Sequence, residues 1–340
     1  MQPPVTLVVP LRNEEESILA LLSSIDDQTT PPEQVVLVDG GSTDGTLGII
    51  RAHAGGNARY TVVEAVGGAT PGRGRNLGFA SARNDWIAMT DAGIRLEPTW
   101  MERLWAAHLS APAAEVIYGN YEFDLRSFFE ECAAVSYCDT KHSTPVGRCR
   151  APQVVSCLVS RRAIETVGGF ADARSGEDEI FVRALEAARL PVTWAPDATV
   201  WWRLRPDLRS TFERFRSYSY HYALAGQQRH WHHRMARSYL PVAAGLVLAC
   251  TSSRRWLVLP AAMISARSGV RIRRHRREMD VLRHPGPARV GLITFLVVAN
   301  DVATALGWCQ ATLHRRSSGR DSRVVTGGRA GGRGRHAGDV

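Results

Sequence analysis

Four short motifs between Val5 and Pro98 carry side chains that suit a phosphorylated ligand. Each follows an apolar, strand-like run and stands at or before a helical pattern, which is where open α/β sheets bind their ligands. Their order along the chain therefore predicts that one nucleotide-sized ligand contacts all four. The motifs are Pro10-Leu11-Arg12-Asn13-Glu14, Asp39-Gly40-Gly41-Ser42-Thr43-Asp44-Gly45, Gly72-Arg73-Gly74-Arg75-Asn76 and Thr90-Asp91-Ala92-Gly93.

Two of these motifs place an aspartate directly after a strand-like run. Asp39 precedes a glycine-rich turn that lets backbone approach a ligand and that opens a helix. Its carboxylate could accept hydrogen bonds from a nucleobase or ribose, or it could simply shape a tight turn with Asp44 as helix cap. Asp91 could hold a divalent cation against a diphosphate, because such ions prefer oxygen ligands and retain waters. It could instead cap a helix ahead of Pro98.

The third motif places two guanidinium groups, Arg73 and Arg75, at a helix start. Charge-assisted bidentate hydrogen bonds from arginine suit the oxygens of a diphosphate. The motif lacks the Gly-Lys-Ser/Thr ending of a Walker loop. A solvated helix end with surface arginines is the alternative.

Three acids, Glu177, Asp178 and Glu179, stand at the N-terminus of an apolar-periodic helix that is expected from Glu177 to Ala188. Acids at a helix start can serve only to stabilise the helix dipole. A base that removes a proton from an acceptor hydroxyl also needs a carboxylate at the edge of a cleft, and Asp178 is placed for that role.

Strand-like and helical runs alternate over residues 5–110 and predict a mostly parallel sheet with right-handed crossovers. Residues 115–205 are more mixed and are expected to form the acceptor side. The expected strands are Val5–Val9, Val35–Val38, Tyr60–Val63, Trp86–Met89, Val116–Tyr121 and Val154–Val159, with extended pieces at Val192–Trp194 and Thr199–Trp202. The expected helices in the alternating part are Glu14–Ile25, Asp44–His53, Arg73–Ala82 and Thr99–Leu109.

The last third of the chain contains three apolar runs. Pro241–Cys250 and Trp256–Ile264 are each too short for the roughly 20 residues that span a bilayer, so a hairpin lying in the membrane interface is expected. Val290–Leu313 is long enough, but Asn300 and Asp301 at its middle would be costly facing lipid. It is therefore either a span with a polar partner or an amphipathic helix.

The chain carries 42 Lys and Arg against 33 Asp and Glu, a net charge of +9, and much of the excess follows Arg267. Arginines between and beyond apolar runs favour an anionic membrane surface as partner. Nucleic acid is not expected, because the arginine run lacks interleaved aromatic residues. The six cysteines form no Cys-x-x-Cys pair and are expected to be reduced. The start of the chain shows no signal-peptide pattern, so the catalytic part is expected at the cytoplasmic face of the cell membrane.

Taken together, these residues resemble glycosyltransferase family 2, the inverting transferases with the GT-A fold. The resemblance covers roughly Val5–Arg205 and implies an α/β fold with a mostly parallel sheet flanked by helices. It also implies transfer of a sugar from a nucleotide-diphospho-sugar to a hydroxyl of a glycan, lipid-linked or secondary-metabolite acceptor. The matching residues are Pro10 with Asn13-Glu14, Asp39 with Ser42-Thr43-Asp44-Gly45-Thr46, Gly74-Arg75-Asn76-Leu77-Gly78, Asp91-Ala92 with Pro98, Gly168-Gly169-Phe170, and Glu177-Asp178.

The resemblance assigns roles to individual residues. Asp178 would be the general base, with Glu177 beside it in the catalytic pair. Arg203 and Arg205 would lie on the acceptor or diphosphate side, and Asp91 would also contact a divalent cation, Mg²⁺ or Mn²⁺. The implied donor-binding residues are Pro10, Asn13, Glu14, Asp39, Gly41, Ser42, Asp44, Arg75, Asn76 and Asp91.

Gly93 departs from the family pattern, because the usual Asp-x-Asp would place a second carboxylate there. The metal requirement is therefore expected to be weakened. Arginines such as Arg75, Arg203 and Arg205 could replace part of the ion's charge. The alternative is a non-catalytic relative that binds nucleotide-sugar or serves as a scaffold.

Three parts are predicted. Residues 1–235 would form the GT-A domain, residues 236–313 an apolar and basic helical region associated with the membrane, and residues 314–340 a disordered Gly/Arg tail that is clearest from Ser317.

Overall fold

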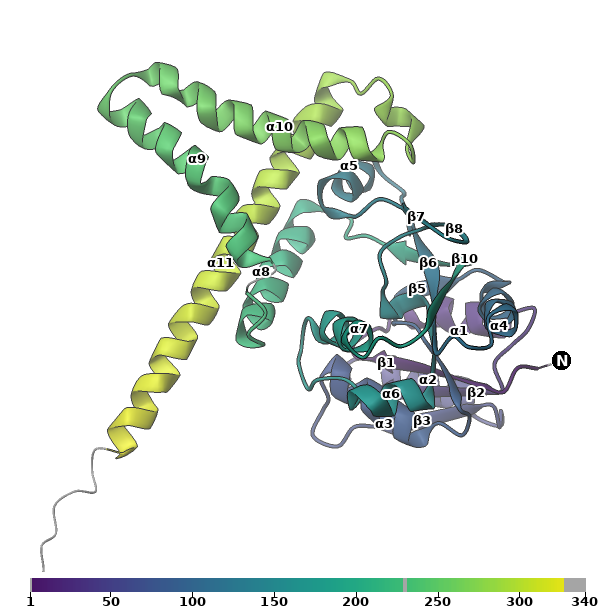
Figure 1. The fold of residues 1–340 in the computed structure, drawn as a ribbon. Helices are drawn as coiled ribbons and strands as arrows, with labels where there is room; N and C mark the ends of the chain where they lie inside the picture. Colours follow the sequence, from purple (N-terminus) through teal and green to yellow (C-terminus); the bar gives the residue numbers. More distant parts are fainter. Residues whose placement is uncertain (1, 229–230, 327–340) are drawn as a thin grey trace, which may run out of the picture.

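A computed structural model describes residues 2–228 and 231–326 of the chain, with the backbone alone for 316–326 (Figure 1). Strands and helices alternate through the first third, as the sequence predicts. The elements there are β1 (Val5–Leu11), α1 (Ile18–Asp26), β2 (Gln34–Asp39), α2 (Thr46–Ala54), β3 (Tyr60–Glu64), α3 (Pro71–Ser81), β4 (Trp86–Met89), β5 (Ile94–Leu96) and α4 (Trp100–Ser110).

The remaining elements complete the sheet and add a helical region. They are β6 (Val116–Asp124), α5 (Phe128–Tyr137), β7 (His142–Thr144), β8 (Gly147–Cys149), η1 (Val154–Ser156), β9 (Cys157–Ser160), α6 (Arg161–Val167), α7 (Glu177–Ala187), β10 (Val192–Arg203), α8 (Leu208–Leu224), α9 (His232–Thr251), η2 (Arg254–Leu257), α10 (Val258–His275), η3 (Asp280–Leu282) and α11 (Pro287–Thr326).

Eight strands form one sheet in the order β3-β2-β1-β4-β9-β6-β10-β5. The pairs β1–β2, β1–β4, β2–β3 and β6–β10 are parallel, whereas β9 runs antiparallel to both β4 and β6. The mostly parallel α/β fold is confirmed. Because only β9 and the edge strand β5 are reversed, the carboxyl ends of β1, β2, β4, β6 and β10 meet at one edge of the sheet.

Several helix starts differ from the predicted ones because loop side chains end or begin the helices. The predicted helix at Glu14 begins at Ile18, since Asn13 has a left-handed backbone (φ 55°) and binds the next β–α loop. The Asp44 carboxylate accepts the Thr46 N–H at 3.1 Å, and α2 begins at Thr46 with Gly45 as its N-cap. The α3 helix begins earlier than predicted, at Pro71 after its Thr70 cap.

Two other expectations change on the acceptor side. The two extended pieces predicted near the end of the sheet are one strand, β10, with a shift of register between Trp194 and Thr199. The strand predicted from Val154 begins only at Cys157, because Val154–Ser156 forms a 3-10 turn. The Ser156 hydroxyl in that turn bonds to the Ala198 carbonyl, which ties it to β10.

Apolar side chains fill both faces of the sheet. Alternate residues of β1 separate the two layers, with Leu7 packed toward α1 and α4 and Val8 toward α3 and α7. Gly78 lets α3 approach β1, since a Cβ at this position would lie 2.3 Å from Val8 Cγ1. The close approach fixes the start of α3, which carries Arg75, against the sheet.

The C-terminal helices form an arm beside this domain. Figure 1 shows α9 and α10 as a hairpin that projects away from the sheet, while the long α11 runs past α5 and α8. The predicted run Pro241–Cys250 lies inside α9, and Trp256–Ile264 spans η2 and the start of α10. Residues 287–315 of α11 form a helix long and apolar enough to cross a membrane, although 39% of its apolar 18-residue window is buried in the protein.

The boundaries of the three predicted parts do not coincide with element ends. The boundary at 235 falls within α9. Residues 314–326 of the expected tail belong to α11, which is helical through Thr326. Residues 327–340 lie outside the described residues.

Candidate active site

A buried arginine joins three elements at the carboxyl edge of the sheet. Arg75 of α3 is 3% exposed, and its Nη2 donates to Asp91 Oδ1 at 2.5 Å, just after β4. Its Nη1 donates to Glu177 Oε1 at 2.8 Å, at the start of α7. The guanidinium carbon also lies 5.0 Å from the centre of the Phe170 ring. The structure thus brings together three residues that the sequence could only predict separately.

Charge is unbalanced in this cluster. Burial alone would lower the pKa of Arg75, but Asp91 and Glu177 raise it above its ordinary value, so the guanidinium stays charged. Burial raises the pKa of Glu177 despite the nearby Arg75 charge. With Asp178 next in the chain, three carboxylates face one guanidinium. A donor diphosphate that approaches Asp91 therefore meets excess negative charge unless a cation accompanies it.

Asp178 lies in the first turn of α7, beside this cluster. Its Oδ1 accepts the backbone N–H of Glu179 at 2.8 Å. Burial raises its pKa, although the positive charge of Arg75 opposes the shift. The preceding Gly176 has φ 81° and packs against the Tyr222 ring, which fixes where α7 begins. A carboxylate held there, with a raised pKa, is suited to accept a proton.

The Asp39 loop is closed by its own hydrogen bonds. Asp39 is 3% exposed, and its carboxylate accepts the N–H groups of Gly41 and Ser42, each at 3.1 Å. The Ser42 hydroxyl donates to the same carboxylate at 2.5 Å. Gly41 has φ 84°, which a residue with a side chain rarely adopts. Asp39 therefore shapes the predicted turn.

The first motif is interlocked with that loop. Asn13 Oδ1 accepts the Thr43 N–H at 2.8 Å, and its own N–H donates to the Ser42 hydroxyl at 2.9 Å. The Glu14 N–H donates to Thr46 Oγ1 at 2.8 Å, and its carboxylate accepts the Ser17 hydroxyl. Pro10, half-buried near the end of β1, lies against Gly74, where a Cβ would come within 3.2 Å of the Pro10 Cβ. The two β–α loops thus form one unit.

Asn76 is occupied by the protein itself. Its Oδ1 accepts the backbone N–H of Phe170 at 2.9 Å, and its Nδ2 donates to the carbonyl of the same residue at 2.8 Å. The side chain holds the turn that precedes α7. In this arrangement Asn76 bonds to Phe170 through both of its polar atoms and so helps to position the start of α7.

Arg203 and Arg205 lie at the end of β10, both exposed. No hydrogen bond or ion pair among the described residues joins them to Asp91, Glu177 or Asp178. Next to them, a cation that the sequence analysis did not single out is packed between two rings. The Arg214 guanidinium of α8 lies 5.1 Å from the centre of the Trp202 ring and 5.0 Å from that of Tyr218.

Tyr222 is a further site residue that the sequence analysis missed. Its hydroxyl donates to Glu179, one residue after Asp178, and its ring contacts Gly176. Arg214, Tyr218 and Tyr222 recur every fourth residue, so they share one face of α8. That spacing is the signal that could have placed this helix against the catalytic one.

Asp91 is the carboxylate that the sequence predicts for a divalent ion. Asp91 Oδ1 binds Arg75, while the side chain is 36% exposed. No group of three His, Cys, Asp or Glu residues that could hold a metal occurs among the described residues. Gly93, with φ 77°, offers no ligand. This arrangement fits an ion of the Mg²⁺ type, which is often held by one or two carboxylates together with waters and substrate phosphates.

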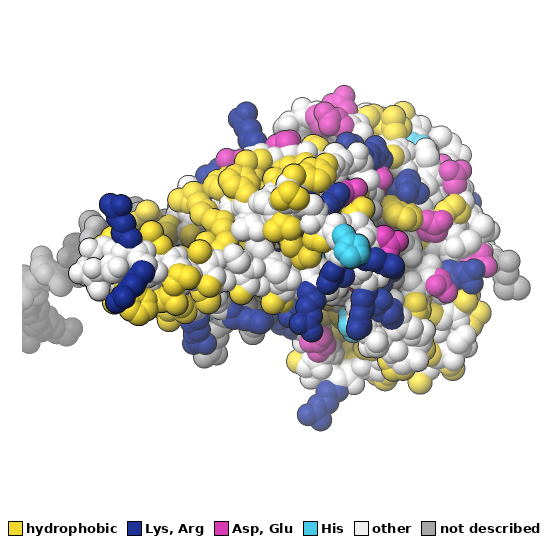
Figure 2. Space-filling view, turned by 90° about the horizontal axis from the view of Figure 1, so that it is seen from above, with side chains coloured by type: hydrophobic (Ala, Val, Ile, Leu, Met, Phe, Trp, Pro, Cys, Tyr) yellow, Lys and Arg dark blue, Asp and Glu magenta, His cyan; other side chains and the backbone are white. Residues whose placement is uncertain are grey.

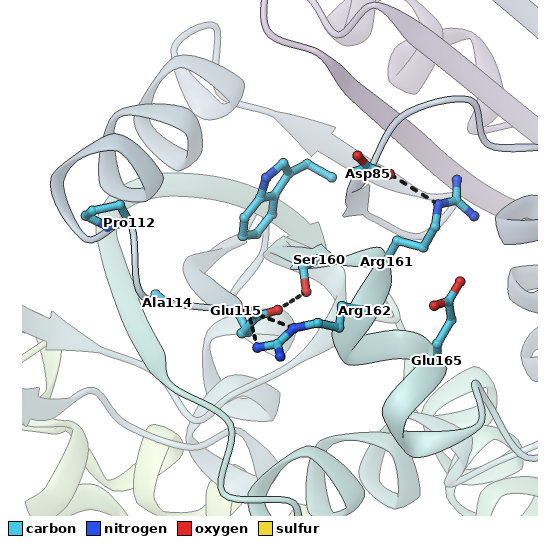
Figure 3. Close-up of a pocket in the computed structure, with 9 residues that line it drawn as sticks. Asp85, Pro112, Ala114, Glu115, Ser160, Arg161, Arg162 and Glu165 are labelled. Atoms are coloured by element: carbon cyan, nitrogen blue, oxygen red, sulfur yellow. Dashed lines mark hydrogen bonds and ion pairs between the residues drawn. The ribbon is translucent and has the colours of Figure 1, made fainter.

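A pocket of about 360 Å³ lies at the opposite edge of the sheet. Asp85 and Trp86 begin β4 there, whereas Asp91 follows its other end. Figure 3 shows Arg162 and Ser160 directed toward Glu115, which both bind. Because its groups are paired with one another and stand far from the carboxyl ends, this pocket does not belong to the candidate site.

Comparison with known proteins agrees with this geometry. Residues 6–131 match the model of Glycosyl transferase family 2. These residues contain all four N-terminal motifs, and the match confirms the family that the motifs predict. No curated protein sequence matches the chain.

Solved structures share the fold. The mannosyltransferase PcManGT from Pyrobaculum calidifontis, in complex with GDP-Man and Mn²⁺, has a TM-score of 0.54 and 19% identity, covering 90% of this chain and 88% of that one. S. aureus TarS 1–349 in complex with UDP-GlcNAc has a TM-score of 0.48 and 15% identity, covering 88% and 91%. A longer S. aureus TarS structure has a TM-score of 0.46 and 16% identity, and the match covers 88% of this chain and 55% of that one. The PcManGT likeness establishes a shared GT-A-type fold.

Proposed function

From the match of residues 6–131 to the model of Glycosyl transferase family 2, we propose that the protein is an inverting glycosyltransferase. Its donor is a nucleotide-diphospho-sugar. Its acceptor carries a hydroxyl group on a glycan, a lipid-linked molecule or a secondary metabolite. The PcManGT structure, which holds GDP-Man and Mn²⁺, supports this class of donor.

The proposed reaction is a single displacement at the anomeric carbon of the sugar. The Asp178 carboxylate accepts the proton of the acceptor hydroxyl while the hydroxyl oxygen bonds to that carbon. The bond between the anomeric carbon and the diphosphate oxygen breaks, and the nucleoside diphosphate leaves with the electron pair. Attack from the face opposite the leaving group inverts the configuration.

One observation carries the proposal. Asp178 lies in the first turn of α7 next to Glu177, and Glu177 is tied through Arg75 to Asp91 at the end of β4. A base and a donor-side carboxylate therefore share one edge of the sheet. Burial raises the pKa of Asp178, so its carboxylate is more basic than that of an exposed aspartate and better able to accept a proton.

Replacement of the base tests this assignment. Asp178→Asn keeps the size of the side chain but removes its basicity, so turnover should fall roughly 100-fold or more while donor binding persists. Sugar release from UDP- and GDP-sugars would be measured together with calorimetric binding of UDP and GDP. Glu186→Gln, on the exposed face of α7, is the matched control and should retain wild-type turnover. Near-normal turnover of Asp178→Asn would remove Asp178 from the mechanism.

We further propose that a divalent cation, Mg²⁺ or Mn²⁺, assists the reaction. Asp91 would hold it together with waters and the donor diphosphate, because no second carboxylate stands at Gly93. When bound, such an ion stabilises negative charge on the departing diphosphate. Arg75 would orient Asp91 for this role. Activity in EDTA equal to that with Mg²⁺ would remove the ion from the proposal.

A non-catalytic nucleotide-sugar-binding relative is the second candidate, and the glycine at position 93 is the observation that favours it. The two candidates differ in turnover rather than in binding. Purified protein that binds UDP or GDP but neither transfers nor hydrolyses any sugar of a donor panel would support the scaffold. Transfer or hydrolysis that Asp178→Asn abolishes would exclude it.

We also propose attachment to the cytoplasmic face of the cell membrane, with an anionic lipid surface as partner and a lipid-linked acceptor. The apolar helices α9, α10 and α11 support this proposal. Fractionation of cells expressing the full chain tests it. Recovery of the full chain as a monodisperse protein without detergent would contradict membrane attachment, while leaving the transfer reaction untouched.

A further inference from the structure

The α9–α10 hairpin has two arms without charged residues. No Asp, Glu, Lys or Arg occurs from Ser238 to Ser253 or from Trp256 to Ala266. Large apolar side chains on these arms are exposed: Leu240 is 66% exposed, Val247 60% and Val258 63%. The arms bury little besides their mutual contact, where Gly245 packs against Pro260. So much exposed apolar surface on one element marks an interaction site.

Arginines stand at both ends of these arms. Arg254 and Arg255 form the tip, and further arginines follow where α10 joins the rest of the molecule. Figure 2 shows the apolar band along the hairpin, with Lys and Arg side chains at its outer end and a larger group of them near the body. The exposed arginines at the two ends that form no ion pair with any described residue are Arg234, Arg237, Arg254, Arg255, Arg273, Arg274, Arg276 and Arg277.

The positions of these charges decide how the hairpin can meet a bilayer. The charge-free part of α9 is about 20 Å long at 1.5 Å per residue, whereas the hydrocarbon core is about 30 Å thick. A perpendicular hairpin would carry Arg254 and Arg255 into that core, where charge is unfavourable. A hairpin parallel to the surface keeps both basic ends at the headgroups and its apolar middle among the acyl chains.

The other helix that could enter a membrane is α11, and it is attached to the catalytic domain at several positions between residues 289 and 315. Arg289 pairs with Glu131 of α5 at 2.5 Å, and Asn300 donates to the Ser136 hydroxyl of the same helix at 3.3 Å. Farther along, Arg315 donates to the Ala223 carbonyl of α8 at 2.7 Å. A crossing α11 would have to separate from α5 and α8 or draw them into lipid.

Asp301 ties α11 to the hairpin as well. Its carboxylate pairs with Arg267 of α10 at 2.6 Å and accepts the Tyr239 hydroxyl of α9 at 2.7 Å. The polar residues that the sequence places in the middle of an apolar run are thus bound by protein groups. They hold the base of the hairpin in a fixed position against the catalytic domain.

From these contacts we infer that the α9–α10 hairpin is a docking surface for an anionic lipid bilayer. The hairpin lies parallel to the membrane surface, and α11 does not span the membrane. The charge-free arms enter the acyl boundary, while the terminal arginines bind lipid phosphates. The inference rests on the proposed membrane attachment and is independent of the transfer reaction.

Vesicle co-sedimentation of the full chain tests the surface. Binding to vesicles of phosphatidylcholine with phosphatidylglycerol should exceed binding to phosphatidylcholine alone, and Arg254→Ser with Arg255→Ser should weaken it by about fivefold per arginine. Val247→Asp with Val258→Asp should abolish binding. The matched control is Val146→Asp, since Val146 is a 54% exposed valine on the catalytic domain. It should bind like the wild type.

Two native cysteines report which helix contacts lipid. Cys250 on α9 and Cys309 on α11 are exposed, and the other four cysteines are buried. An environment-sensitive fluorophore on Cys250, in a Cys309→Ser chain, should shift to the blue on anionic vesicles. The same label on Cys309, in a Cys250→Ser chain, should shift less.

Different outcomes would contradict the hairpin inference and the proposed membrane attachment. Loss of binding in Leu306→Asp of α11, with Val247→Asp/Val258→Asp unaffected, would overturn the hairpin inference but keep membrane attachment. Absence of vesicle binding by the wild type would overturn both. A change from dimer to monomer in Val247→Asp/Val258→Asp, without any vesicle binding, would show that a second copy covers the hairpin. None of these results alters the test of Asp178.

Discussion

The guanidinium of Arg75 donates a 2.8 Å hydrogen bond to the carboxylate of Glu177, which lies 102 positions later in the chain, and both side chains are buried. Asp91 binds the other terminal nitrogen of the same guanidinium. A rigid planar cation therefore connects α3 with α7, the helix that carries the proposed base Asp178. Lysine, with a single ammonium point, could not replace it in this geometry.

Removal of that cation should destabilise the fold. Arg75→Met leaves the buried Glu177 carboxylate unpaired, and such a break costs about 3–5 kcal/mol. Denaturant unfolding would measure the loss. Arg73→Met, at the exposed neighbour on α3, is the control and should change little. Adding Glu177→Gln to Arg75→Met should recover part of the loss, because no buried charge then remains unpaired; strictly additive losses would show that the two residues do not interact.

Asp178 should set the acidic limb of the pH–rate profile. The reaction needs its ionised form, and burial raises its pKa, so turnover should begin to fall at a higher pH than for an aspartate titrating near its ordinary value of about 3.9. The same shift means that the folded state binds this proton more tightly than the unfolded state. The contribution of Asp178 to stability thus becomes more favourable as pH falls through its folded-state pKa.

Asp178→Asn provides the check on both statements. The residual turnover of this variant should no longer show the acidic limb in its pH–rate profile. The substitution should also raise the unfolding free energy near neutral pH, because a carboxylate that is costly to bury is replaced by a neutral amide. Unfolding curves at several pH values would measure the second effect. A lower stability of Asp178→Asn at neutral pH would contradict the raised pKa.

Asp39 and Asp91 should affect donor binding in different ways. Asp39→Ala removes the acceptor that organises the Gly41–Ser42 turn, so affinity for UDP or GDP should drop whether or not Mn²⁺ is present. Asp91→Ala should weaken binding chiefly in the presence of Mn²⁺. Calorimetric titration with and without the ion distinguishes them. Equal affinities in wild type and both variants would place the donor elsewhere.

Position 93 should tolerate poorly the aspartate that the Asp-x-Asp pattern of the family places there. Its φ is 77°, and a Cβ there would lie 3.7 Å from Glu14 Oε2, so an aspartate would be strained and would approach another acid. Gly93→Ala should cost about 1–2 kcal/mol from backbone strain alone. Gly93→Asp should be less stable than wild type without metal. It should also gain more stability from Mn²⁺ than wild type does, which thermal unfolding would show; equal gains would mean that position 93 does not face the ion.

Asn76→Ala should separate a positioning role from donor contact. The substitution leaves the Phe170 backbone N–H and carbonyl without their partner, and unsatisfied groups of this kind cost about 1–3 kcal/mol each. We expect lower stability and a lower kcat, because α7 loses its anchor, with calorimetric affinity for UDP or GDP unchanged. A selective loss of nucleotide affinity at normal stability would restore Asn76 to the donor site.

The sequence by itself determined the alternating scaffold and the edge at which the site lies. Apolar periods of two and of 3.6 residues reflect only local geometry, so strands such as Val35–Val38 and the polar turn after Asp39 were predictable. Parallel strands with right-handed crossovers then place Asp39 and Asp91 at the same edge of the sheet, at the ends of β2 and β4, which flank β1. The conformation of each turn also depends on residues within a few positions, as at Asp44 and Gly41.

Tertiary structure decided what each polar group contacts. Asn76 resembles a donor ligand in the sequence, yet it binds Phe170, which lies 94 residues away. Asp301 resembles a misplaced charge in a membrane span, yet it pairs with Arg267 and Tyr239. A buried polar group takes whatever partner the packed helices bring to it, and sequence periodicity does not encode which helix that is.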